Sequence, residues 1–158
     1  MEHNLTPVRK IISGGQTGVD RAALDVAIAL SIPCGGWCPR GRLAEDGVIP
    51  EKYPLKETES ADYAERTAMN VRDSDGTLVI TWAPPADGTA YTVDVALALS
   101  KPHYVVDLRE GDDVDDTVEW LWANRIRTLN VAGPRAGKCP RIYPLAVEFL
   151  TRLLRGNP

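Results

Sequence analysis

The sequence predicts an α/β fold, with a mainly parallel sheet flanked by helices. Short apolar, β-branched segments alternate with helical patterns of about 10 to 15 residues, which is typical of βαβ units. Glycine-rich loops follow three of the predicted strands. The 158 residues, 44% of them apolar, suffice for one domain over residues 1–158 with a substantial core.

The first predicted strand, Val8–Ser13, runs into a pair of glycines. A helix follows from Thr17 to Leu30, because this stretch is rich in Ala, Leu, Ile and Val and closes before Pro33. The glycine- and proline-rich segment 34–50 is predicted to be a long loop. A short extended piece is expected at Tyr53–Lys56.

A helix is predicted over residues 60–73, with Ser60 as its N-cap. Its apolar stripe at helical spacing is Ala64, Ala68 and Val71. Thr77–Trp82 is apolar and β-branched, which indicates a buried strand. The loop 83–88 leads into a helix that ends at Pro102 and is followed by a strand at His103–Leu108. The apolar face of that helix is predicted to be Val93, Ala96 and Leu97.

Four aspartates crowd the start of the next helix, where carboxylates favour the positive end of the helix dipole. They are Asp112, Asp113, Asp115 and Asp116. The predicted apolar stripe of this helix is Val114, Val118, Leu121 and Trp122. Trp120 and Trp122 lie two positions apart and must diverge, so one of them is expected in a subunit interface.

The last strand and the last helix complete the predicted pattern. The strand is Thr128–Ala132, and the helix runs over residues 143–155. Apolar residues at helical spacing predict the buried face of this helix. They are Ala146, Phe149, Leu150, Leu153 and Leu154.

Composition limits the possible function classes. A net charge of −4 argues against a nucleic-acid-binding protein. The start Met1-Glu2-His3-Asn4 has no basic and apolar leader, and no apolar run approaches the roughly 18 to 20 residues of a membrane span. Three cysteines do not make a disulfide framework. From these observations together we expect a cytoplasmic protein without membrane contacts.

The glycine-rich loops are the candidate ligand site, because open parallel sheets bind ligands beyond the carboxyl ends of their strands. Backbone N–H groups at helix starts and nearby cations favour an anion such as phosphate. The candidates in the first loop are Gly14, Gly15, Gln16, Thr17, Gly18, Asp20 and Arg21. Those in the later loops are Arg40, Gly88, Thr89, Thr92, Gly133, Pro134, Arg135 and Lys138.

Simpler interpretations stay open for several of these residues. The first loop can be a tight turn before a capped helix, with Thr17 and Asp20 forming a capping box. Thr89 can be a helix cap, Arg135 and Lys138 can be solvated surface charges, and Trp37 can pack in the core or stack on a heterocycle. Metal-ligand clusters and Ser/His/Asp arrangements are missing from the sequence, so no catalytic or metal-binding residue is predicted.

The loops also carry a family resemblance. The stretches Ile11–Asp25, Gly35–Gly47 and Asn130–Arg135 resemble the molybdenum-carrier family, in the same order and over nearly the whole chain. The resemblance implies a Rossmann-like, three-layer α/β/α fold related to the lysine-decarboxylase-like phosphoribohydrolases. It also implies a homodimer or homotetramer that carries molybdenum cofactor, a phosphorylated pterin, with molybdoenzymes as recipients.

One position separates this chain from the hydrolases. Their signature P-G-G-x-G-T-x-x-E ends in a catalytic Glu, and the corresponding stretch Pro84–Thr92 ends in threonine. A threonine cannot act as a general base near neutral pH, so binding without catalysis is favoured. The alternatives are a nucleotide-binding or nucleotide-hydrolysing protein that uses another carboxylate, such as Asp20 or Asp87, and a nucleotide sensor that signals to a partner.

Overall fold

A five-stranded, entirely parallel sheet forms the centre of the molecule, as described by a computed structural model of residues 5–111 and 113–156. The strand order is β2-β1-β9-β7-β8. The strands are β1 (Lys10–Ile12), β2 (Cys34–Gly35), β7 (Gly76–Thr81), β8 (His103–Asp107) and β9 (Thr128–Ala132). The predicted Rossmann-like α/β fold is confirmed.

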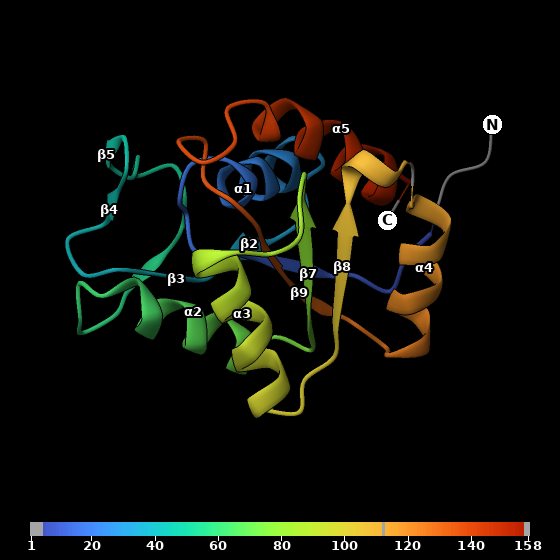
Figure 1. Ribbon diagram of the computed structural model, residues 1–158, viewed down its shortest axis with the longest axis horizontal. Helices are drawn as coiled ribbons and strands as arrows, with labels where there is room; N and C mark the ends of the chain where they lie inside the picture. Colours follow the sequence, from blue (N-terminus) through green and yellow to red (C-terminus); the bar gives the residue numbers. More distant parts are fainter. Residues whose placement is uncertain (1–4, 112, 157–158) are drawn as a thin grey trace.

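Within the described part of the chain, five α-helices cover the two faces of this sheet (Figure 1). On one side lie α1 (Val19–Ala29), α4 (Val114–Ala123) and α5 (Ile142–Leu154), where α5 packs against both α1 and α4. On the other side, α2 (Tyr63–Arg72) packs against α3 (Asp87–Ala98). A single 3-10 turn, η1 (Leu108–Glu110), follows β8.

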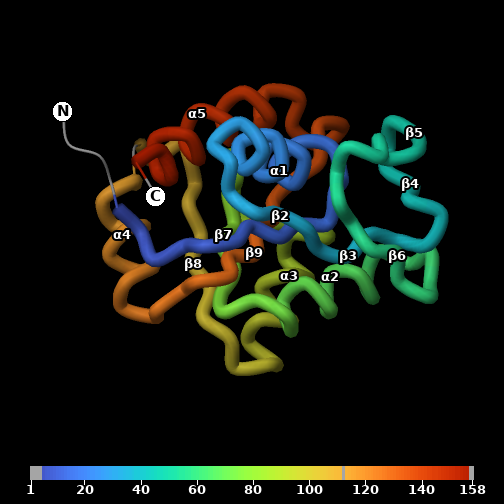
Figure 2. The backbone as a smooth tube through the Cα atoms, turned by 180° about the vertical axis from the view of Figure 1, so that it is seen from behind, coloured from blue at the N-terminus to red at the C-terminus, as the bar shows by residue number. Residues whose placement is uncertain are grey.

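Two small strand pairs lie beyond β2. One is the parallel pair of β3 (Trp37–Cys38) and β6 (Lys56–Glu57), and the other is the antiparallel hairpin of β4 (Leu43–Ala44) and β5 (Gly47–Val48). Figures 1 and 2 place this hairpin at the end of the molecule farthest from α4. The segment 34–50, predicted to be a loop, therefore contains four two-residue strands. They are too short to produce a pattern in the sequence.

The core confirms most of the predicted apolar faces. All six residues of β7 are buried, as expected for a central parallel strand covered on both sides. The whole predicted face of α5 is buried as well. Two predicted members of other stripes are wrong: Leu97 is 61% exposed at the end of α3, and Trp122 is 53% exposed on α4.

The helix starts also differ from the sequence prediction. Asp62, not Ser60, is the N-cap of α2, because its carboxylate accepts the Ala64 N–H, while the Ser60 hydroxyl accepts the Asp62 N–H. The two tryptophans of α4 do diverge. Trp120 stacks on Tyr104 with the ring centroids 5.6 Å apart, and the Trp122 indole N–H donates to the Leu5 carbonyl.

One carboxylate fastens the segment before β6 to two helices. Asp25 of α1 accepts hydrogen bonds from the hydroxyls of Tyr53 and of Tyr143 on α5. Burial and the Asp25 carboxylate raise the pKa of the Tyr143 hydroxyl to about 12, so the phenol stays a donor at neutral pH.

We expect Asp25→Ala to lower the free energy of unfolding by about 2 kcal/mol, because it removes the acceptor of two partly buried donors. Asp25→Asn keeps one carbonyl acceptor and should lose less than half as much. Urea denaturation of the three proteins measures both values. Equal stability of Asp25→Ala and the unchanged protein would show that these hydrogen bonds do not fasten the segment.

Candidate functional site

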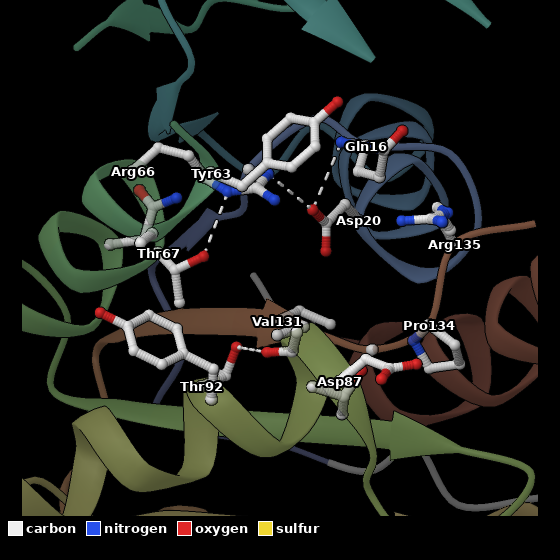
Figure 3. A pocket seen from close by; sticks show the side chains of 18 of the residues that line it. Gln16, Asp20, Tyr63, Arg66, Thr67, Asp87, Thr92, Val131, Pro134 and Arg135 are labelled. Atoms are coloured by element: carbon white, nitrogen blue, oxygen red, sulfur yellow. Dashed lines mark hydrogen bonds and ion pairs between the residues drawn. The ribbon is translucent and has the colours of Figure 1, made fainter. Parts of the chain in front are cut away.

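The loops after β1, β7 and β9 meet at one edge of the sheet and enclose a pocket of about 350 Å³. These strands are neighbours in the parallel sheet, so their carboxyl ends lie together. The helix α2 forms a fourth wall of the pocket, facing the loop after β1 (Figure 3). The size lies at the lower end of the range for small-molecule sites.

A buried ion pair lies in the wall of this pocket. Asp20, in the first turn of α1, accepts from the Arg66 guanidinium of α2 at 3.3 Å, and both side chains are about nine-tenths buried. The same carboxylate oxygen accepts the Gln16 N–H at 3.3 Å. In Figure 3 the Arg66 guanidinium and the Asp20 carboxylate face each other beside the ring of Tyr63.

Burial raises the pKa of Asp20 to about 6, although the guanidiniums of Arg66 and Arg21 act in the opposite direction. The Asp20 carboxyl group therefore binds its proton more tightly in the folded protein than in the unfolded chain. Its contribution to stability is therefore fully present below about pH 4 and is lost as the pH rises through 6.

We expect the difference in stability between Asp20→Asn and the unchanged protein to grow by about 2 to 3 kcal/mol in favour of the variant between pH 4 and pH 7. Carboxylates with lowered pKa values, such as Asp73 and Asp107, act alike in both proteins and cancel in the difference. Chemical denaturation at several pH values measures it. A difference that stays constant with pH would contradict the raised pKa.

Besides Arg66 of α2, two cationic residues of the pocket come from the loop after β9. The Nε of Arg135 lies 3.0 Å from a Glu45 carboxylate oxygen, and the Lys138 ammonium lies 3.5 Å from Asp87 at the start of α3. All of these side chains are at least a quarter exposed, so solvent screens both pairs. Among the described residues, no side chain caps α3, and its first turn lines the pocket.

Ten of the predicted site residues line the pocket. They are Gly14, Gln16, Asp20, Gly88, Thr89, Thr92, Gly133, Pro134, Arg135 and Lys138. Thr89 is not the cap of α3, because the helix starts two residues earlier, after Ala86. The Thr92 side chain is buried, and its hydroxyl donates to the Gly88 carbonyl at 3.0 Å.

The other five predicted residues lie outside the pocket lining. Gly15 packs against Leu55 and Ile49, and Gly18 against the Pro134 backbone. Arg21 pairs with Asp46, and Arg40 is exposed. The predicted capping box is wrong, because α1 begins after Gly18 without a side-chain cap from any described residue, and the Thr17 hydroxyl contacts Glu45 instead.

Trp37 does not stack in this pocket either. Its indole N–H donates to Asp73 at 2.8 Å, and the Lys56 ammonium lies over its half-buried ring. Cys38 is buried and Cys34 half-buried, and burial raises the pKa of both thiols.

Sequence reasoning missed the contribution of two helices. Tyr63, Arg66 and Asn70 form a stripe on the pocket side of α2, with Thr67 beside them, and Tyr91 of α3 also lines the cavity. A signal was present, since Tyr63, Arg66 and Asn70 follow each other at spacings of three and four residues and so share one face of a helix. That face of α2 is polar, so the apolar stripe that predicts the helix does not reveal it.

Within the described ranges, no group of three or more His, Cys, Asp or Glu side chains is arranged to hold a metal ion. None of the described helices is long and apolar enough to cross a membrane.

Comparison with known proteins identifies the family. The model of the circularly permutated YpsA SLOG family matches residues 11–154, which include every loop of the pocket. The chain belongs to the circularly permutated YpsA SLOG family. A solved protein of similar sequence is the "putative molybdenum carrier protein" of Syntrophus aciditrophicus SB, at 47% identity and a TM-score of 0.92. The match covers 94% of this chain and 96% of that one. No curated protein matches the chain.

The circular permutation of the family bears on the comparison of Thr92 with the catalytic Glu of the hydrolases. A permuted chain presents its elements in a different order, so positions matched in chain order need not be equivalent in space. The loop after β1, Gly14–Asp20, also has paired glycines, a further glycine and then an acidic residue. Asp20, in place of Thr92, is therefore the candidate residue for acid–base chemistry.

Proposed function

We propose that the protein binds a phosphate-bearing heterocyclic ligand in this pocket and holds it without converting it. The observation that carries the proposal is the joint presence, around one cavity, of a buried carboxylate with its Arg66 partner, two further cationic side chains and a helix start that no described side chain caps. The carboxylate suits a ring that donates hydrogen bonds, and the cations and the helix start suit an anionic group. A phosphate-bearing heterocycle combines both features.

The phosphate is assigned to the loops after β7 and β9. Arg135 offers a planar guanidinium, Lys138 a point charge, and the first turn of α3 its backbone N–H groups and the positive end of the helix dipole. The carboxylates now paired with Arg135 and Lys138 form partly exposed ion pairs, which contribute about 0 to 1 kcal/mol each. A phosphate can replace such partners.

The heterocycle is assigned to the wall formed by α1 and α2. The Asp20 carboxylate can accept hydrogen bonds from ring N–H and amino groups, as carboxylates do with cytosine amines. Tyr63 and Tyr91 border the cavity and offer flat faces for a ring. The Arg66 guanidinium favours the ionised form of this carboxylate and orients it.

The ligand proposed first is molybdenum cofactor, a pterin with a terminal phosphate. The solved relative at 47% identity is described as a molybdenum carrier, and the pocket offers partners for both parts of the cofactor. A carrier of this kind would work in the cytoplasm as a homodimer or homotetramer and deliver its cargo to molybdoenzymes.

Isothermal titration with a phosphorylated pterin and the same pterin without phosphate tests the proposal. A charged hydrogen bond contributes about 1.5 to 3 kcal/mol, so the phosphorylated compound should bind at least about tenfold more tightly. At 100 times its dissociation constant it should also stabilise the fold by about 2.7 kcal/mol. Equal affinities for the two compounds would reject the phosphate site.

Nucleotide hydrolysis is the second candidate, and Asp20 is the observation that favours it. A buried carboxyl group with a pKa raised to about 6, lining a cavity, is a candidate general acid or base. Incubation with nucleoside monophosphates, followed by chromatography of the free base, separates the two candidates. Steady release that disappears in Asp20→Asn would make the protein a hydrolase, and no release would leave the carrier function first.

A further inference from the structure

The carboxylate of Glu45 lies in a set of hydrogen-bond donors beside the pocket. It accepts from the Thr17 hydroxyl, from the Gly137 N–H at 2.7 Å and from Nε of Arg135 at 3.0 Å. Glu45 belongs to the turn of the β4–β5 hairpin, whereas its donors come from the loops after β1 and β9. The hairpin thus reaches across to the site from outside the central sheet.

We infer that these donors form an oxyanion subsite, that the Glu45 carboxylate occupies it in the free protein, and that the phosphate of a bound ligand displaces Glu45. The inference rests on the proposed function, because it concerns the phosphate end of the same ligand. It places that group on the Glu45 side of Arg135, where Thr17 and Gly137 supply the other donors in place of Lys138 and the first turn of α3. It also adds a resident competitor for the site.

The donor set suits a tetrahedral oxyanion. It combines a hydroxyl, a backbone N–H and a guanidinium, which are the groups that hold phosphate elsewhere in proteins. The Thr17 hydroxyl is oriented from behind, since it accepts the Ala136 N–H at 3.1 Å and so directs its own proton toward the anion.

Space for the anion depends on a glycine. A Cβ on Gly137 would lie 2.5 Å from a carboxylate oxygen of Glu45, which is closer than real Cβ atoms approach other atoms. With a side chain at residue 137, the carboxylate of Glu45 would have to move away from this backbone.

Gln16 connects the hairpin to the pocket. Its side chain lines the cavity, and its carbonyl oxygen accepts the N–H groups of both Thr17 and Glu45, at 3.0 and 2.8 Å. A ligand that contacts Gln16 thus acts on the backbone that carries Glu45. On the outer side of the hairpin, Leu43 and Val48 are at least half exposed.

Glu45 is a permanent competitor at neutral pH. The hydrogen bonds from Thr17 and Gly137 and the charge of Arg135 hold the pKa of its carboxyl below the usual range. A phosphate brings about 1.5 to 2 negative charges and more acceptor oxygens than a carboxylate, so it has the stronger attraction to the same donors.

Titration with inorganic phosphate tests the subsite directly. If Glu45 occupies the subsite in about nine-tenths of the molecules, removing it should increase phosphate affinity about tenfold. The comparison uses the unchanged protein, Glu45→Ala, and Glu45→Gln in case the alanine variant does not fold. The matched control is Asp46→Asn, which removes the same charge from the same turn, but from a residue that pairs with Arg21.

We expect phosphate to bind Glu45→Ala or Glu45→Gln about tenfold more tightly and Asp46→Asn within about twofold of the unchanged protein. Adding Thr17→Val to the Glu45 variant should reverse the gain. An equal gain in Asp46→Asn, no gain in the Glu45 variants, or a gain that survives Thr17→Val would each overturn the inference.

These outcomes are separate from those of the proposed function, because inorganic phosphate has no ring. Failure of every phosphorylated heterocycle to bind, together with the expected phosphate gain, would reject the proposed function and keep the subsite. Tight pterin phosphate binding that does not change in the Glu45 variants would reject the subsite alone.

Discussion

Gly133→Ala is expected to lower the free energy of unfolding by about 3 kcal/mol or more, as overpacking of a filled core does at its upper end. A Cβ at this position would lie 2.2 Å from the Ile80 carbonyl oxygen of β7 and 2.6 Å from a methyl carbon of Val19. Neither neighbour can move easily, because one is strand backbone and the other is fully buried in α1. The ends of β9 and β7 would have to separate, beside the pocket that Gly133 lines.

Gly88→Ala is the matched control for this prediction. Gly88 also lines the pocket, but a Cβ there meets no described atom within 4 Å, and the residue lies in α3. Alanine favours helices over glycine by about 0.5 to 1 kcal/mol, so this variant should be as stable as the unchanged protein or slightly more so. Urea denaturation of both variants gives the comparison. A Gly133→Ala protein as stable as Gly88→Ala would show that the loop after β9 is not closely packed.

Arg135→Ala should weaken binding of a phosphorylated ligand about tenfold or more, because it removes a charged hydrogen bond. The fold should be unaffected, since the side chain is 42% exposed and Glu45 keeps its hydrogen bonds to Thr17 and Gly137. The matched control is Arg72→Ala, which removes the same charge from an exposed pair with Asp73 outside the pocket lining.

Isothermal titration of these two variants with phosphorylated pterin measures the effect. We expect Arg72→Ala to bind like the unchanged protein. If a folded Arg135→Ala protein binds equally well, the loop after β9 does not contact the phosphate.

The sequence was informative wherever hydrophobic periodicity decides the structure. The buried face of α5 could be predicted because its apolar residues recur at helical spacing. The strand β7 could be predicted because its apolar, β-branched residues form an uninterrupted run, the pattern of a strand buried on both faces. The two-residue strand β2 could not, because its pairing with β1 is decided by the sheet and not by its own residues. Trp122 is exposed although it is apolar, because the buried stripe of α4 is too narrow to include it.

Some residues of the candidate site could also be predicted from the sequence, and others could not. Loops with several glycines at strand ends pointed to Gly14, Gly88 and Gly133, since the parallel sheet brings such loops together. Glu45 could not be predicted, because it reaches the site from the turn of a short hairpin outside the sheet. Arg66 shares a polar helix face with Tyr63 and Asn70, but the sequence does not show that this face meets Asp20. Their roles depend on tertiary contacts with Asp20 and Arg135, which no local pattern encodes.

The most direct test of the proposed function is to identify what the protein retains when it is purified without oxygen from cells that make molybdenum cofactor. The ligand is released by denaturation and identified by mass spectrometry, from the unchanged protein and from Arg135→Ala in parallel. We predict a phosphorylated pterin in the unchanged protein and a depleted amount in the variant. A pocket that releases no phosphorylated heterocycle, or equal amounts from both proteins, would contradict the proposed binding site.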